Sequence, residues 1–197
     1  MGPAEWPTGF EGRLILDVGT FQRLLKIRDK FGPGIFGKIT QKLLALAFYE
    51  AHFDHVVERE VQGVDIDVSA GDDKRFALEV KTTGGESVPI SRENIDALKD
   101  RAKDGYKPLI AALRMQMFED WMFAGFPLRR LEPGFIQFTK LRSYRNRELE
   151  NLICPAFEQV VNQHFGNVLT KGEYYLNELL AQKRESHNQK ERKISSL

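Results

Sequence analysis

The clearest pattern in the chain is a pair of short stretches that alternate between apolar and polar residues. The first is VDIDV at residues 64–68, and the second is FALEVK at residues 76–81. A period of two residues is typical of β-strands, and the polar turn between the stretches favours a hairpin. The alternation places the polar side chains of both strands on one face of this hairpin. These side chains are Asp65, Asp67, Glu79 and Lys81.

The rest of the pattern predicts helices on either side of further strands. The predicted helices cover residues 20–31, 38–53 and 91–103, with Thr20 and Ser91 as N-caps. The further predicted strands cover residues 56–61, 106–115, 120–126 and 135–140. We therefore expect an α/β fold with a mixed β-sheet core flanked by helices and a helical C-terminal part.

The C-terminal third carries two helix-start signals. Pro155 suits the first turn of a helix, and Thr170 with Glu173 forms a capping-box pattern before another. The polar tail, residues 182–197, is expected to be frayed or disordered.

Composition narrows the class of protein. The chain has 197 residues, of which 42% are hydrophobic and 29% are charged, as expected of one globular domain. The net charge of +1 provides no overall attraction to nucleic acids, so a polyanion site must come from a local cluster. Cys154 is the single cysteine, which excludes an internal disulfide framework and a four-cysteine zinc site. With neither a membrane-length apolar run nor a secretory signal pattern, we expect a cytoplasmic protein with no membrane association.

The charges of the hairpin suit metal-assisted hydrolysis of phosphodiesters. Strands near the middle of an α/β pattern are usually covered on both faces, so Glu79 and Lys81 should be partly buried and need partners or a metal. Asp65 on the neighbouring strand lets a carboxylate from each strand converge. Two carboxylates suit Mg²⁺, and a nearby lysine can position a water and offset phosphate charge. The alternative interpretation is an ordinary solvated face of the sheet.

The spacing of these residues resembles a known motif. Val64-Asp65 is followed fourteen residues later by Glu79-Val80-Lys81, which is similar to the PD-(D/E)xK nuclease superfamily. This restriction-endonuclease-like group includes type II restriction enzymes, Mrr-like enzymes and archaeal Holliday-junction resolvases. The resemblance implies that Asp65 and Glu79 are metal ligands, that the Val80 carbonyl is a further ligand, and that Lys81 positions the attacking water. It also implies Mg²⁺ as the cofactor, with Mn²⁺ as a substitute.

The chain departs from the family pattern at two positions. Val64 stands where the motif has its leading proline, and Gln41 falls where relatives often carry a glutamate on the first core helix. A glutamine can hold a metal-bound water but cannot act as an ionised ligand. Glu50 on the same helix and Asp67 on the Asp65 strand are therefore additional candidates for the site.

A basic segment at residues 138–148 provides candidate nucleic-acid contacts. Its candidate residues are Lys140, Arg142, Tyr144, Arg145 and Arg147. Clustered cations around an aromatic ring suit phosphate contact and base stacking, although a solvated surface segment explains the cluster equally well. Arg92 and Asn94, at the start of the 91–103 helix, are further candidates.

The residues and the resemblance together lead to one functional hypothesis. Residues 1–197 form a single nuclease domain with a core at about 36–125, and residues 126–197 form an extension for recognition or dimerisation. The domain is a Mg²⁺-dependent DNA endonuclease that uses a metal-activated water, and it is expected to be a homodimer because cutting two strands takes two sites. The alternatives are a structure-selective nuclease acting on Holliday junctions or repair substrates, and a non-catalytic nucleic-acid-binding member of the same fold.

Overall fold

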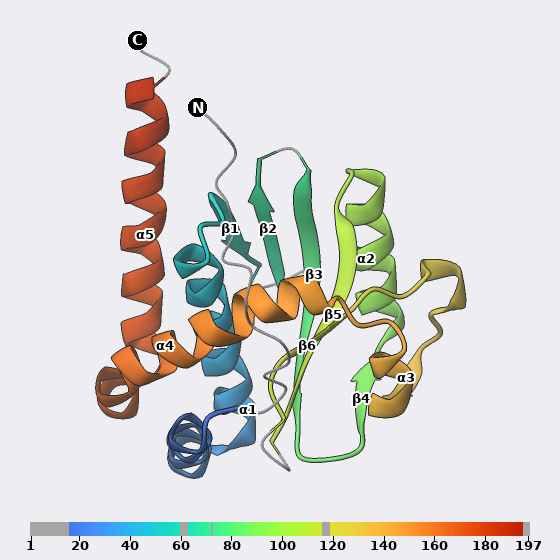
Figure 1. Cartoon of the computed structure of the whole chain (residues 1–197), viewed down its shortest axis with the longest axis horizontal. Helices are drawn as coiled ribbons and strands as arrows, with labels where there is room; N and C mark the ends of the chain where they lie inside the picture. Colours follow the sequence, from blue (N-terminus) through green and yellow to red (C-terminus); the bar gives the residue numbers. More distant parts are fainter. Residues whose placement is uncertain (1–15, 60–62, 72, 116–118, 195–197) are drawn as a thin grey trace.

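A mixed five-stranded β-sheet forms the centre of the computed structural model, which describes residues 16–59, 63–71, 73–115 and 119–194 (Figure 1). Its strands, in spatial order, are β1 (His55–Glu58), β2 (Ile66–Ala70), β3 (Lys74–Thr83), β5 (Lys107–Arg114) and β6 (Met122–Ala124). β3 and β5 are parallel, and the other neighbouring pairs are antiparallel. β4 (Ser87–Ile90) and β7 (Gly134–Gln137) form a separate antiparallel pair.

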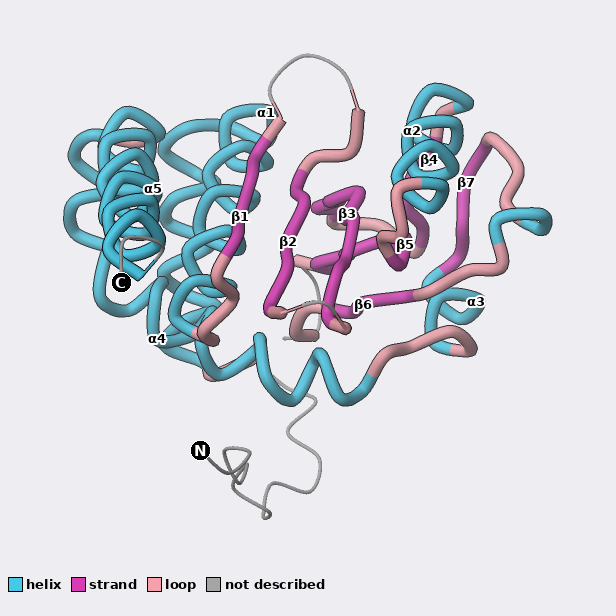
Figure 2. The backbone as a smooth tube through the Cα atoms, turned by 90° about the horizontal axis from the view of Figure 1, so that it is seen from above, coloured by secondary structure: helices cyan, strands magenta, loops and turns pink. Residues whose placement is uncertain are grey.

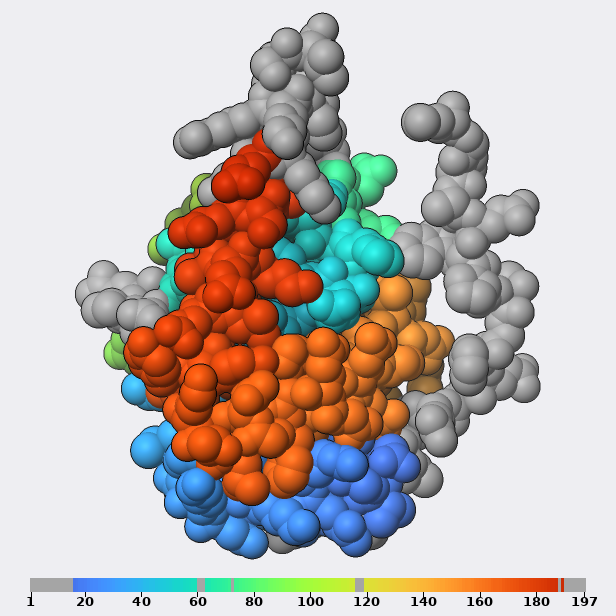
Figure 3. Space-filling view, turned by 90° about the vertical axis from the view of Figure 1, so that its left-hand side faces the viewer, coloured from blue at the N-terminus to red at the C-terminus, as the bar shows by residue number. Residues whose placement is uncertain are grey.

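Helices cover both faces of the five-stranded sheet. α1 (Val18–Glu50) and α4 (Arg147–Lys171) pack on one face, and α2 (Arg92–Lys103) packs on the other (Figure 2). α5 (Glu173–Ile194) packs along α1 on the face seen in Figure 3, and its Arg184 bonds Glu58 at the end of β1. The short elements η1 (Leu128–Arg130) and α3 (Phe138–Arg142) flank β7. The expected α/β fold with a mixed sheet, flanking helices and a helical C-terminal part is confirmed.

The two predicted N-terminal helices form one element with a kink. Gly32 has φ 78° and ψ 164°, which interrupts the helical backbone immediately before Pro33. Glycine is suited to this position because it has no Cβ to clash at positive φ. The start of the helix differs from the prediction, because the side chain of Asp17 accepts the hydrogen bond of the Thr20 N–H. Asp17, and not Thr20, is therefore the N-cap.

Three predictions for the C-terminal third were wrong. Pro155 lies inside α4 and not in its first turn. Thr170 belongs to α4, where its hydroxyl donates to the Gly166 carbonyl, and the chain turns instead at Gly172 with φ 61°. The described part of the polar tail is helical to Ile194.

Tertiary contacts explain why α5 extends so far into the polar tail. Leu176 and Leu180 of α5 are buried in the cluster that also holds the apolar face of α1. This packing anchors α5, so the polar residues that follow continue an already formed helix.

Residues 138–140 also differ from the prediction, because they begin α3 and do not extend β7.

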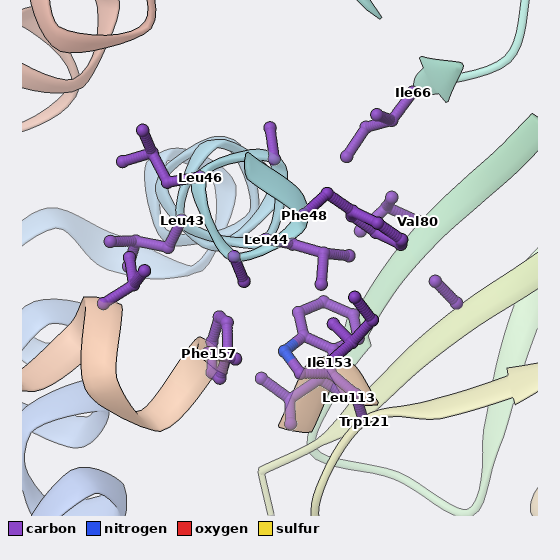
Figure 4. Close-up of a cluster of buried hydrophobic side chains, with 14 of the residues drawn as sticks. Leu43, Leu44, Leu46, Phe48, Ile66, Val80, Leu113, Trp121, Ile153 and Phe157 are labelled. Carbon is purple, nitrogen blue, oxygen red and sulfur yellow. The ribbon is translucent and has the colours of Figure 1, made fainter. Parts of the chain in front are cut away.

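The core consists of two hydrophobic clusters, one on each side of the sheet. On the α1 side, Phe48 lies near Val80 of β3, and Trp121 packs edge-on against Phe157 of α4 with ring centroids 5.4 Å apart (Figure 4). Because β3 alternates, Leu78 and Val80 enter this cluster while the intervening positions face α2. Glu79 therefore points towards α2.

Among the described residues, no helix combines the length and the apolar character needed to cross a membrane.

Candidate active site

The candidate site begins with the register of the β2–β3 hairpin. Ile66 pairs with Leu78, so the preceding Asp65 comes opposite Glu79 at the end of the ladder. Side chains directly opposite each other in an antiparallel pair lie on the same face and are close neighbours. The Asp65 Oδ2 atom accepts a hydrogen bond from the Val80 N–H at 2.7 Å, which ties this carboxylate to β3. Carboxylates from two strands thus meet, as the alternation predicts.

Lys81 completes the group on β3. It lies two residues beyond Glu79 and therefore on the same face of the strand. Its Nζ atom is 2.5 Å from Oε1 of Glu79. The Glu79 side chain is only 1% exposed, whereas the Lys81 side chain is 22% exposed. The lysine is therefore anchored at a buried carboxylate and still reaches solvent.

The second oxygen of Glu79 is the most unusual atom of the site. Oε2 is buried and makes no hydrogen bond with the described residues. Burial, together with the charge of Asp65, raises the pKa of Glu79 to about 7. Burial also raises the pKa of Asp65, against the effects of the Val80 hydrogen bond and Lys81. Two adjacent carboxylates with too little positive charge to balance them provide a favourable position for a cation.

The oxygen donors of Asp65 and Glu79 are of the kind that Mg²⁺ prefers. Within the described ranges, no group of three or more His, Cys, Asp or Glu side chains is placed to hold a metal. Mg²⁺ does not need such a cage, because it is usually bound by one or two carboxylates while waters and substrate phosphates supply the other oxygens. Asp65 and Glu79 provide two hard carboxylates, one with a bare oxygen, so the residues present fit this ion.

Gln41 reaches the same place from α1. Its Nε2 atom donates to the backbone carbonyl of Asp65 at 3.3 Å. The side chain thus fixes the backbone at the end of β2. The sequence placed Gln41 beside the site correctly, although the observed contact is with the backbone and not with the carboxylate of Asp65.

Asp67 and Glu50, the two additional candidates, engage other partners. Asp67 is 1% exposed, and its oxygens accept hydrogen bonds from Arg59 and Arg101, both at 3.0 Å. Glu50, the last residue of α1, accepts a hydrogen bond from Lys183 of α5 at 2.9 Å. The structure therefore gives Asp67 an arginine partner on each side and places Glu50 against α5, so neither joins Asp65 and Glu79.

The predicted basic cluster is largely engaged in contacts within the protein. Arg145 forms a bidentate pair with the buried Glu150, at 2.6 to 2.9 Å, and is itself 13% exposed. Arg142 is hydrogen-bonded to Glu119. The Tyr144 ring packs on Phe126 with centroids 4.4 Å apart, and the Lys140 ammonium lies 6.0 Å from the centre of the same Phe126 ring. Arg147 is exposed.

The other two candidates lie at the start of α2. The Asn94 side chain completes a capping box with Ser91, which accounts for its hydrogen bonds. Arg92 is exposed in the first turn of the helix. Asn94 also lines a groove that runs past Asp65, and Arg92 does not.

This groove contains residues that the sequence did not single out. It has a volume of about 750 Å³ and lies between the end of the β2–β3 hairpin and α2. Its lining includes Asp65, Gly63, Asn94, Arg59 and Arg101, together with acidic residues of α2. Arg59 was missed because its position beside Asp65 depends on the pairing of β1 with β2, which no local pattern reveals.

Comparison with known proteins finds similarity among solved structures. No protein-family model matches the chain, and no curated protein matches it either. The chain is similar to an archaeal Holliday junction resolvase. That structure is Hjc from the hyperthermophile Archaeoglobus fulgidus, at 20% sequence identity and a TM-score of 0.48, covering 58% of this chain and 95% of the resolvase. The function of this chain is therefore inferred from the geometry of its own side chains.

Proposed function

We propose that this chain is a Mg²⁺-dependent nuclease that hydrolyses phosphodiester bonds of DNA. The observation that carries the proposal is the meeting of Asp65, Glu79 and Lys81 on one face of the hairpin, with a buried Glu79 oxygen that no described residue satisfies. The same three residues carry the resemblance to PD-(D/E)xK nucleases, which supports DNA as the substrate.

Each side chain has a role that follows from its contacts. Mg²⁺ bound by Asp65 and Glu79 would stabilise negative charge on the phosphate and lower the pKa of a bound water. Lys81, held by Glu79 and open to solvent, hydrogen-bonds the attacking water and offsets phosphate charge. The Val80 N–H orients the Asp65 carboxylate, and Gln41 holds the backbone of the same residue. Rigid strand positions of this kind keep reacting groups aligned.

Two alternatives differ in substrate and in chemistry. A structure-selective nuclease would use the same residues on a branched DNA, and the comparison structure is by name a Holliday junction resolvase. A non-catalytic nucleic-acid-binding protein is favoured by one observation, the neutral Gln41 in place of an acidic side chain.

If both strands of a duplex are cut, two active sites are needed. We therefore also propose a homodimer, which light scattering can test.

The decisive experiment is a cleavage assay with Mg²⁺, Mn²⁺ or EDTA. Its substrates are supercoiled plasmid, linear duplex, single strand and four-way junction. We expect metal-dependent cleavage by the wild type and a loss of at least about 100-fold for Lys81→Ala. Lys183→Ala is the matched control, because Lys183 bonds Glu50 on the opposite side of α1. If the wild type cleaves none of these substrates with either metal, the nuclease proposal is refuted.

A further inference from the structure

Arg59 stands in the same cross-strand row as the two candidate metal ligands. Glu58 pairs with Ile66, so Arg59 comes opposite Asp65, and the Arg59 N–H donates to the Asp65 carbonyl at 3.1 Å. Asp65 in turn lies opposite Glu79 on β3. Opposite residues of antiparallel strands project to the same face. The guanidinium of Arg59 is therefore a direct neighbour of the candidate site.

Asp67 holds this guanidinium by one edge. Its Oδ2 atom lies 3.0 Å from Nε and 2.9 Å from Nη2 of Arg59. The Asp67 side chain is 2% exposed, whereas that of Arg59 is 41% exposed. Asp67 contacts Arg59 through Nε and Nη2 and leaves the third nitrogen, Nη1, outside this pair. A buried carboxylate thus fixes one edge of the guanidinium, and the other edge is open to solvent.

The second arginine on Asp67 is more fully occupied. Arg101 donates through Nε to Asp67 at 3.0 Å and through Nη1 to Asp104 at 2.5 Å. Its guanidinium also lies 4.1 Å from the centre of the Tyr106 ring, and its side chain is 18% exposed. Asp67 is shared by two guanidinium groups, and Arg101 also pairs with Asp104, whereas the ion pair of Arg59 among the described residues is with the shared Asp67.

The groove leaves room for a ligand beside Arg59. The stem of Arg59 runs close to Gly63, where a Cβ would lie 3.2 Å from Cδ of Arg59 and where the φ of 117° favours glycine. Two of the acidic residues of α2 that line the groove have a lysine partner. Asp96 pairs with Lys99 at 3.5 Å and Asp100 pairs with Lys103 at 2.6 Å. Their pairing lowers the repulsion that an anionic ligand would meet.

We propose that Arg59 binds a backbone phosphate of the nucleic acid next to the one that is cleaved, and that Asp67 is its positioning residue. The inference rests on the proposed nuclease function, because it takes the substrate of that site as its ligand. A guanidinium held along one edge presents its other donors in a fixed direction, which suits the oxygens of a phosphate. Asp67 thus serves the site through Arg59 and not as a metal ligand.

The test separates binding from cleavage. Affinity for a short fluorescent duplex and for the single strand of the same sequence is measured by anisotropy over a range of salt concentrations. Ca²⁺ replaces Mg²⁺, because it takes the same kind of oxygen ligands. Arg59→Ala should weaken binding about 10- to 100-fold. It should also reduce the slope of log Kd against log salt by about 0.9 for the duplex, which corresponds to one lost phosphate contact.

Two further variants distinguish a phosphate contact from a structural effect. Arg59→Lys keeps the charge, so it should keep the salt slope while losing part of the affinity. Arg23→Ala is the matched control, because Arg23 lies over Phe165 on the α1–α4 side of the molecule. Melting temperatures of all variants report on folding. A purely structural Arg59 would lower the melting temperature without changing the salt slope.

The outcomes for the two proposals differ. If the wild type cleaves DNA while folded Arg59→Ala binds it with unchanged affinity and slope, the Arg59 inference is overturned and the nuclease function stands. If the wild type binds with an Arg59-dependent slope but never cleaves, the phosphate site stands and the nuclease proposal fails. If the wild type neither binds nor cleaves any substrate, both are overturned.

Discussion

Replacing Glu79 by glutamine should make the metal-free protein more stable at neutral and alkaline pH. Glu79 is 1% exposed, and burial beside Asp65 raises its pKa from the ordinary value of 4.5 to about 7. The folded protein therefore favours the protonated acid. Glutamine has nearly the same shape and stays neutral, its carbonyl can still accept from Lys81, and its amide can donate towards Asp65. The substitution thus removes the energetic cost of a buried charge.

The magnitude follows from the pKa difference between folded and unfolded protein. One pKa unit corresponds to about 1.4 kcal/mol, so a rise from 4.5 to about 7 destabilises the ionised folded state by up to about 3 kcal/mol. Below pH 4.5 the side chain is protonated in both states, and this cost is absent. As the pH rises towards 7 the unfolded state ionises first, and the wild type loses stability. Above pH 7 the full difference remains.

Urea unfolding in EDTA between pH 5 and pH 8.5 measures this effect. Glu79→Gln should be no more than about 1 kcal/mol more stable than the wild type at pH 5 and about 2–3 kcal/mol more stable at the alkaline end. Added Mg²⁺ should stabilise the wild type and have little effect on the variant, because a bound ion stabilises the folded state only where it binds. Glu50→Gln is the control, because Glu50 bonds Lys183 of α5; it should not gain stability at alkaline pH and should keep the response of the wild type to Mg²⁺. A variant that is no more stable than the wild type at pH 8 would refute the argument that Glu79 is a buried, uncompensated charge.

Three further predictions address other parts of the molecule. Asp67→Asn should lower the free energy of unfolding by about 2–4 kcal/mol in urea, because it leaves two arginines facing a neutral side chain; a loss below 1 kcal/mol would show that the pair contributes little. Gln41→Glu should tighten Mg²⁺ binding about 10-fold by calorimetry, since it adds a third carboxylate near Asp65; unchanged affinity would place this side chain outside the metal's reach. Gly172→Ala should lower stability by about 1 kcal/mol or more, because Gly172 has φ 61° and a Cβ there would lie 3.2 Å from Phe31. Gly166 lies within α4 with open space around it, so Gly166→Ala should raise stability slightly in the same thermal scan.

Local pattern was sufficient for the central hairpin and for the group of residues on it. Side chains alternate along a strand with a period of two, so Asp65 and Glu79 share one face once both stretches are strands paired in the observed register, Ile66 with Leu78. The α2 helix was predicted with its boundaries, because the Ser91 cap and the apolar spacing are contained within the segment itself. The mixed sheet followed from the order of these elements.

Contacts between distant segments decided the rest. Glu150 pairs with Arg145 and Glu119 with Arg142, so two residues of the predicted basic cluster have partners within the protein, and the pairing of β1 with β2 brought Arg59 beside Asp65. Packing against α1 extended α5 through a polar tail that has little apolar surface of its own. A sequence pattern reports which face a side chain is on. Whether a charge on that face meets a partner, a ligand or water depends on the elements that pack against it, and only the tertiary structure determines this.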